Sequence, residues 1–100
     1  MATYNKQIKY IANHYGLEKQ LVKSLEELDE LKAEIKSYIE DPDDYLLYRL
    51  ADEMADAEIM ISQLKILLNL SDAVEEVKEN KIARQLGRIE AEKSATNQFV

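Results

Sequence analysis

The sequence contains no cysteine and a single histidine, His14. Disulfide bonds and thiolate metal sites are therefore excluded, and so is a zinc site of the usual multi-histidine kind. Two glycines and one proline in 100 residues leave little material for hairpins, bulges or glycine-rich phosphate loops. Leucine, isoleucine, glutamate, lysine and alanine dominate what remains, and these residues favour helices. The composition predicts a single all-α domain.

Positive charge and long apolar runs are also scarce. The net charge of −7 argues against a nucleic-acid partner, because a phosphate polyanion requires a basic surface. No apolar run approaches the roughly 20 residues that span a bilayer, and the N-terminus lacks the apolar core of a signal peptide. We therefore expect no membrane association and a cytoplasmic location.

The spacing of the apolar residues predicts four helices. The first should end at Gly16, because glycine adopts the left-handed cap conformation at low cost. The only strong turn signal is the segment Asp41-Pro42-Asp43-Asp44. We expect helices over residues 3–15, 17–40, 44–68 and about 72–93, in one domain over residues 1–93 that is followed by a flexible C-terminal tail over residues 94–100.

The two central helices are similar in length and joined by a short turn, which predicts a long antiparallel hairpin. The third helix has apolar residues on two sides, and a helix of this kind must be covered on both. One hundred residues can hardly provide that cover, so we expect a homodimer or homotetramer. The second helix carries its apolar residues at three- and four-residue steps: Leu21, Leu25, Leu28, Leu31, Ile35 and Ile39.

Acidic residues gather on the second helix, in the segment Glu26-Glu27-Leu28-Asp29-Glu30. At about 100° per residue, Glu26 and Glu30 nearly eclipse one another and Glu27 lies beside them. Like charges at these spacings repel one another. A solvated acidic face would account for this motif when it is taken alone.

A second acidic motif, Glu53-Met54-Ala55-Asp56, places two carboxylates one turn apart on the third helix. Glu53 projects into the apolar stripe of this helix, and a buried unpaired carboxylate costs several kcal/mol. Either Arg49, one turn earlier, or a metal ion shared with the glutamates of the second helix could neutralise it. A carboxylate cluster without histidine or cysteine selects a hard cation, Mg²⁺ or Mn²⁺.

Together the motifs form the pattern E-E-x-x-E, a 22-residue spacer over residues 31–52, and E-x-x-D. This pattern resembles the signature of the all-α nucleoside triphosphate pyrophosphohydrolases, and within them it is most similar to the MazG-like branch. Residues 16–25 carry a glutamine and a lysine upstream of the acidic pair, as that branch does. Asn80-Lys81 with Arg84 resembles the basic element on its last helix. The resemblance covers residues 16–88.

The resemblance implies a four-helix MazG-like bundle, completed by oligomerisation, that hydrolyses a nucleoside triphosphate to the monophosphate and pyrophosphate. Such an enzyme would clear or limit a nucleotide pool. The catalytic candidates are Glu27, as a ligand of Mg²⁺ with Mn²⁺ as a substitute, and Glu26, as a further ligand or the group that orients the attacking water. The implied metal ligands are Glu27, Glu30, Glu53 and Asp56. The implied substrate-binding residues are Gln20, Lys23, Asn80, Lys81 and Arg84.

Other interpretations remain open. Phosphoribosyl-ATP pyrophosphohydrolase is similar in fold, length and acidic motifs, but its first motif usually continues into small residues, whereas this chain has Leu28-Asp29-Glu30-Leu31. A helical adaptor or coiled-coil protein would explain the leucine spacing and the acidic surface, but not Glu53. The chain departs from the family in having no Trp or Phe near the N-terminus to sandwich a base. The possible stacking partners for a base are instead tyrosines, although core or interface packing is the alternative for each: Tyr15, Tyr38, Tyr45 and Tyr48.

Overall fold

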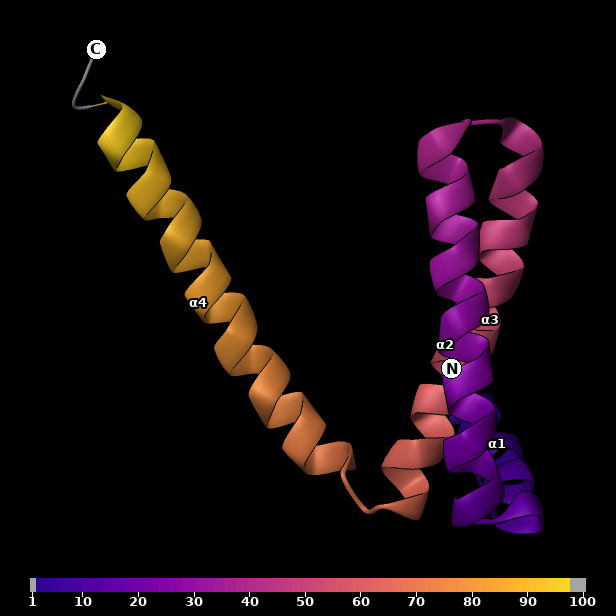
Figure 1. Cartoon of the computed structure of the whole chain (residues 1–100). Helices are drawn as coiled ribbons and strands as arrows, with labels where there is room; N and C mark the ends of the chain where they lie inside the picture. The colour runs from indigo at the N-terminus through magenta and orange to yellow at the C-terminus, as the bar shows by residue number, and fades with distance from the viewer. Residues whose placement is uncertain (1, 98–100) are drawn as a thin grey trace. The chain divides into compact units, whose positions relative to one another are not determined.

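The computed structural model describes the backbone of residues 2–97 and the side chains of residues 4–96. Over this range the protein is all-helical and has no strand, which confirms the predicted class (Figure 1). The helices are α1 (Ala2–Tyr15), α2 (Leu17–Glu40), α3 (Asp44–Leu67) and α4 (Ser71–Asn97). Residues 94–97 were expected in the flexible tail, but they are helical and form the end of α4. The rest of the expected tail, residues 98–100, lies outside the described residues.

Local sequence signals account for the helix boundaries. Gly16 separates α1 from α2 with φ of 87°, a conformation that glycine adopts without strain. Its N–H still donates to the Ala12 carbonyl at 2.8 Å, so the end of α1 is capped. Before α3, the side chain of Asp43 accepts a hydrogen bond from the Tyr45 N–H at 2.9 Å, as expected of an N-cap. Asn69, between α3 and α4, has φ of 55°, in the region that asparagine tolerates best after glycine.

The contacts within the chain divide it into two units, with the boundary between Leu70 and Ser71. The first unit contains α1, α2 and α3, and the second contains α4. The expected single domain over residues 1–93 stays a prediction.

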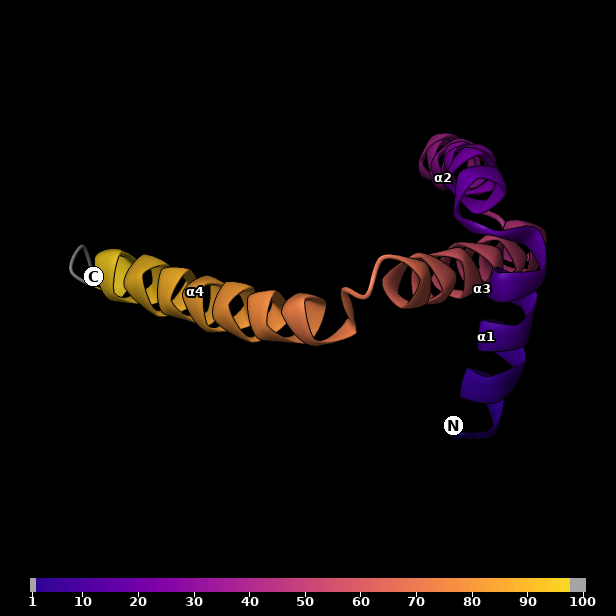
Figure 2. The same ribbon diagram turned by 90° about the horizontal axis from the view of Figure 1, so that it is seen from below.

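Within the first unit, α3 runs back alongside α2 (Figure 1). Gln20, near the start of α2, contacts Gln63, near the end of α3, whereas Glu34 in the last third of α2 contacts Arg49 near the start of α3. Residues later in α2 therefore contact residues earlier in α3. α1 packs against α3 and, less extensively, against α2 (Figure 2).

The contact between α2 and α3 is mainly polar on the α2 side. The buried residues of α2 are Gln20, Ser24, Glu27 and Glu34, separated by four, three and seven positions, so they share one face of the helix. On α3 the buried residues are mostly apolar: Leu50, Ala57, Met60 and Gln63. A polar stripe of one helix therefore packs on a largely apolar stripe of the other. A carboxylate on this polar face of α2 is consequently desolvated.

An apolar seam usually marks the face that a helix buries. The α2 seam, defined as Leu21, Leu25, Leu28, Leu31, Ile35 and Ile39, does not follow this rule within the single chain. Leu25 and Ile39 are 66% and 71% exposed, and most of the others are also exposed. The seam lies one residue further along than the buried polar stripe, which is a rotation of about 100° around α2. The first unit therefore presents its most regular apolar face to the outside.

No helix in the described part of the chain is both long and apolar enough to cross a membrane.

Candidate metal centre

Four carboxylates converge where the middle of α2 faces the middle of α3. Glu27 and Glu30 come from α2, and Glu53 and Asp56 come from α3. One oxygen atom from each residue lies within 4.8 Å of the corresponding oxygen of every other. The three-residue step turns both members of each pair to the same side of their helix. The structure thus brings together the four residues that were predicted as metal ligands, and we refer to them as the carboxylate cluster.

The carboxylate cluster is partly withdrawn from solvent. Glu27 is only 8% exposed, Glu53 and Asp56 are half-buried, and Glu30 is exposed. Glu27 Oε2 and Glu53 Oε2 are enclosed and accept no hydrogen bond from the described residues. An enclosed polar atom without a partner is costly and is rare in native proteins. Both the oxygen donor set and these two unpartnered atoms fit a hard divalent cation held between the helices.

The local environment opposes ionisation of the cluster. Desolvation, followed by the charge and close contact of Glu30, raises the pKa of Glu53 above its ordinary value. Desolvation is also the largest cause that raises the pKa of Asp56, and the charges of Glu27 and Asp52 add to it. Carboxylates that are held together in this way bind protons or metal ions more readily than isolated ones. The cluster is therefore poised to accept a cation.

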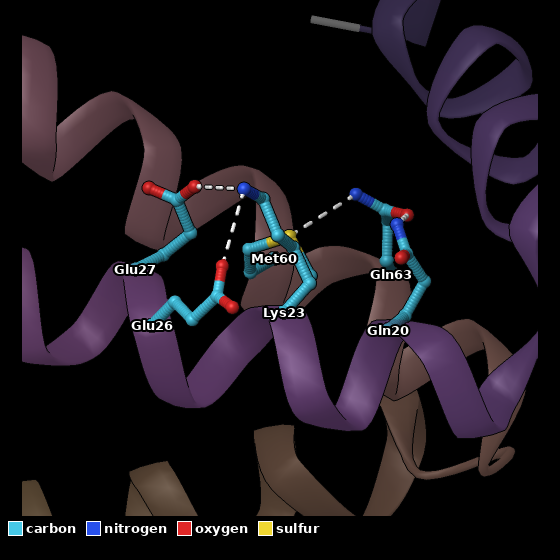
Figure 3. A network of polar contacts seen from close by, with 6 residues as sticks. All are labelled: Gln20, Lys23, Glu26, Glu27, Met60 and Gln63. Atoms are coloured by element: carbon cyan, nitrogen blue, oxygen red, sulfur yellow. Dashed lines mark hydrogen bonds and ion pairs between the residues drawn. The ribbon is translucent and has the colours of Figure 1, made fainter.

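A single lysine reaches the edge of the cluster. Lys23 Nζ lies 3.3 Å from Glu27 Oε1 and 3.4 Å from Glu26 Oε2 (Figure 3). Hydrogen bonds to these two carboxylates raise the pKa of Lys23. The Glu26 side chain is 60% exposed and lies outside the group of four, on the same edge as Lys23. One lysine charge cannot neutralise four carboxylates, so most of the negative charge remains uncompensated.

Arg49 does not neutralise Glu53. Its Nη2 pairs instead with Glu34 Oε1 at 2.6 Å, nearer the turn that joins α2 to α3. Within residues 4–96, no lysine or arginine forms an ion pair with Glu53. The alternative in which Arg49 meets Glu53 is therefore wrong for this structure, because the opposite run of the helices aligns Arg49 with Glu34.

A pocket of about 470 Å³ adjoins the edge of the cluster. Its size falls in the range of about 300–1,000 Å³ that is usual for small-molecule sites. Two predicted substrate-binding residues, Gln20 and Lys23, lie in its wall, and Lys23 also contacts the cluster. The full lining is Tyr15, Lys19, Gln20, Val22, Lys23, Glu26 and Met60. A ligand in this pocket could therefore reach the carboxylates past Lys23 and Glu26.

Sequence reasoning did not assign a role to Met60 or Gln63 in this region. Gln63 Oε1 accepts a hydrogen bond from Gln20 Nε2 at 2.7 Å, and Gln63 Nε2 donates to Met60 Sδ at 3.6 Å (Figure 3). The available signal was their spacing, since Asp56, Met60 and Gln63 follow one another at four and three residues on α3. That spacing continues the cluster along one face of the helix.

The remaining predicted substrate-binding residues lie in the second unit. Asn80, Lys81 and Arg84 are all exposed on α4. Their contact with phosphate stays a prediction.

No family model matches this chain, and neither does a curated protein or a solved structure. The functional argument therefore rests on the geometry of the cluster and on the spacing of the motifs.

Proposed function

We propose that this protein is a Mg²⁺-dependent, MazG-like nucleoside triphosphate pyrophosphohydrolase, which releases pyrophosphate and a nucleoside monophosphate. One observation carries the proposal. Two neighbouring helices direct four carboxylates at a common point, and two of the oxygen atoms there are enclosed without a partner. Glu34 Oε2 is enclosed in the same way, but its other oxygen pairs with Arg49 and no second carboxylate of the cluster lies beside it.

In this proposal Glu27, Glu30, Glu53 and Asp56 hold the ion, and Mn²⁺ can replace Mg²⁺. An all-carboxylate set without nitrogen or sulfur favours hard cations such as these. The bound ion would neutralise phosphate charge and lower the pKa of an attacking water.

The residues of the chain itself position the reactants, which is the main task in cleaving a phosphate anhydride. Glu26 lies on the exposed edge of the cluster, where its carboxylate can accept a hydrogen bond from the attacking water. Lys23 would move from Glu27 to a phosphate oxygen when the triphosphate binds, because both are anionic acceptors for the same ammonium group.

A MazG-like bundle with α2 and α3 as its antiparallel central hairpin also requires cover for the α2 seam. We infer that a second copy supplies it, in a homodimer or homotetramer, because the exposed leucines and isoleucines step regularly along one face of α2. The proposed role is removal of unwanted nucleotides from the cytoplasmic pool, with no nucleic acid or membrane as partner.

The test is pyrophosphate release from a panel of canonical and modified ribo- and deoxyribonucleoside triphosphates, with and without Mg²⁺. Phosphoribosyl-ATP belongs in the panel, because the related pyrophosphohydrolase of histidine synthesis would cleave it in preference to the others. We expect release of equal amounts of monophosphate and pyrophosphate that depends on Mg²⁺. If no member of the panel is cleaved by the Mg²⁺-loaded oligomer, the proposed activity is wrong.

The exposed seam also favours a second candidate, a helical adaptor or coiled-coil protein without enzymatic activity. Such a protein needs the seam but has no use for the carboxylate cluster. Its thermal stability should therefore not respond to millimolar Mg²⁺, whereas an enzyme that binds the ion should be stabilised.

A further inference from the structure

A short hydrogen-bonded chain crosses from α3 to the wall of the pocket. Met60 Sδ accepts from Gln63 Nε2, and Gln63 Oε1 accepts from Gln20 Nε2 (Figure 3). All three side chains are buried, and Gln63 is only 2% exposed. Gln20 and Met60 line the pocket beside Lys23. These hydrogen bonds therefore link the interior of the first unit to the proposed substrate site.

Met60, at the buried end of this series of hydrogen bonds, determines which group donates and which accepts at each step. A thioether sulfur can accept a hydrogen bond but has no proton to donate. Gln63 must therefore turn its NH₂ group towards Met60 and its carbonyl towards Gln20. The reverse orientation would leave an enclosed carbonyl against sulfur without a donor, and the burial of Gln63 leaves no access for water.

The same argument determines the orientation of the Gln20 amide. Because Gln63 presents a carbonyl, Gln20 has to meet it with its own NH₂ group, at the observed 2.7 Å. Gln20 Oε1 then points away from Gln63, accepts no hydrogen bond from the described residues and is not among the enclosed unpartnered oxygens. The pocket wall thus presents the Gln20 carbonyl oxygen as an acceptor, and Gln63 and Met60 on α3 determine its orientation.

The pocket around this acceptor suits a flat, weakly polar group. Tyr15 and Val22 contribute apolar surface to it, and Lys23 and Glu26 lie on the side of the carboxylate cluster. Gln20 and Glu27 are seven residues apart on one face of α2, a rise of roughly 10 Å that a ribose and its phosphates can bridge. A nucleotide with its phosphates at the cluster would place its base in the pocket.

We propose that Gln20 determines base specificity by accepting a hydrogen bond from an amino or ring N–H group of the base, and that Met60 and Gln63 orient its amide for this purpose. The inference rests on the proposed function, since it assigns the base-binding part of that substrate site. Gln20 would contact the substrate, whereas Met60 and Gln63 are positioning residues.

The test is equilibrium binding of nucleoside monophosphates, measured by calorimetry without metal so that no turnover is needed. Adenosine, guanosine and cytidine monophosphates are each compared with the analogue in which hydrogen replaces the amino group. We expect at least one amino compound to bind about tenfold more tightly than its analogue, the factor that corresponds to one good hydrogen bond. The same preference should appear in the kcat/KM values for the corresponding triphosphates.

Three variants separate the roles. Gln20→Leu should abolish the preference. Met60→Leu conserves volume but removes the sulfur acceptor, so both orientations of the Gln63 amide become available and the preference should fall to about threefold or less. Met54→Leu, on the exposed side of α3, is the matched control and should leave the preference unchanged. Circular dichroism verifies that each variant is folded, and Met60→Leu remains informative if Gln20→Leu does not fold.

The outcomes distinguish this inference from the hydrolase proposal. Binding with a preference that disappears in Gln20→Leu and falls in Met60→Leu supports the inference, even if no triphosphate is cleaved and the hydrolase proposal fails. Cleavage without any preference, a preference that survives in Gln20→Leu, or one that Met60→Leu leaves intact overturns it. It is likewise overturned if no monophosphate binds to the wild-type protein.

Discussion

Two groups of acidic side chains lie along the same contact between α2 and α3, and they differ in how their charge is balanced. Nearer the turn, Glu34 is buried and pairs with Arg49 at 2.6 Å. Seven residues earlier on the same face of α2, Glu27 is equally buried but belongs to a cluster of four carboxylates that only Lys23 approaches. At one site a single carboxylate meets its own guanidinium, whereas at the other one lysine faces four carboxylates. The comparison indicates that packing alone does not explain the cluster, because the same contact provides a guanidinium where one is needed.

The largest effect should follow removal of one negative charge from the cluster. Glu53→Gln should lower the rate of pyrophosphate release by at least about 100-fold, because it removes a charged group from the proposed metal site. Without metal the variant should melt at a higher temperature than the wild type, since carboxylate repulsion decreases and the new amide can donate to Glu30. Steady-state kinetics and thermal melting check both parts.

The matched control for this variant is Glu34→Gln, which makes the same change at a buried glutamate of the neighbouring site. It should retain most of the activity. Full activity in Glu53→Gln, or equal losses in the two variants, would show that the cluster has no special role.

The second effect concerns metal binding. At a Mg²⁺ concentration about 100-fold above the dissociation constant, the free energy of unfolding should rise by about 2.7 kcal/mol. For a protein of 100 residues this raises Tm by more than about 10 °C. Differential scanning calorimetry with Mg²⁺, and again after addition of a chelator, measures the change. The rise in Tm with Mg²⁺ should persist in Arg49→Met and should be mostly lost in Glu53→Gln. If neither Mg²⁺ nor Mn²⁺ changes the Tm of the wild type, the proposed metal site is wrong.

A smaller effect is expected at the site that contains its own cation. Arg49→Met should destabilise the protein by about 2 kcal/mol, because it leaves the buried Glu34 carboxylate without its partner. The double variant Glu34→Gln with Arg49→Met should recover part of this loss, since no buried charge remains. Urea denaturation of the single and double variants tests the coupling. Simple additivity of the two changes would show that the pair does not stabilise the fold.

The smallest effect is the pH dependence of the metal-free protein. Desolvation and then neighbouring carboxylates raise the pKa values of Glu53 and Asp56 above their ordinary 4.5 and 3.8. Between the ordinary and the raised values the folded state binds more protons than the unfolded state, so stability falls as pH rises through this window. Acidification from neutral pH towards these ordinary values should therefore increase Tm.

Thermal melts over that pH range should show a shallower slope for Glu53→Gln than for the wild type. Saturating Mg²⁺ should reverse the trend, because the ion binds the ionised carboxylates. A wild-type slope that matches that of the variant would mean that Glu53 contributes nothing to the pH dependence.

Part of this protein could be predicted from local patterns. Gly16 and Pro42 interrupt the helical pattern, and the helices begin and end beside them. Helical spacing placed Glu26, Glu27 and Glu30 near one another on the second helix, and the family resemblance implied the four ligands that the structure brings together. Helical periodicity is a short-range property, so the order of residues suffices to establish it.

The sequence by itself thus determined the four helices, the breaks between them and the acidic motif on each central helix. Only the tertiary structure decided that α2 buries Gln20, Ser24, Glu27 and Glu34 while its leucine seam remains exposed, and that Arg49 meets Glu34 and not Glu53. The two faces of α2 differ by one residue in register, and a helix can pack on either. Which face is buried depends on the partner helix, and that choice lies in contacts between residues far apart in the chain.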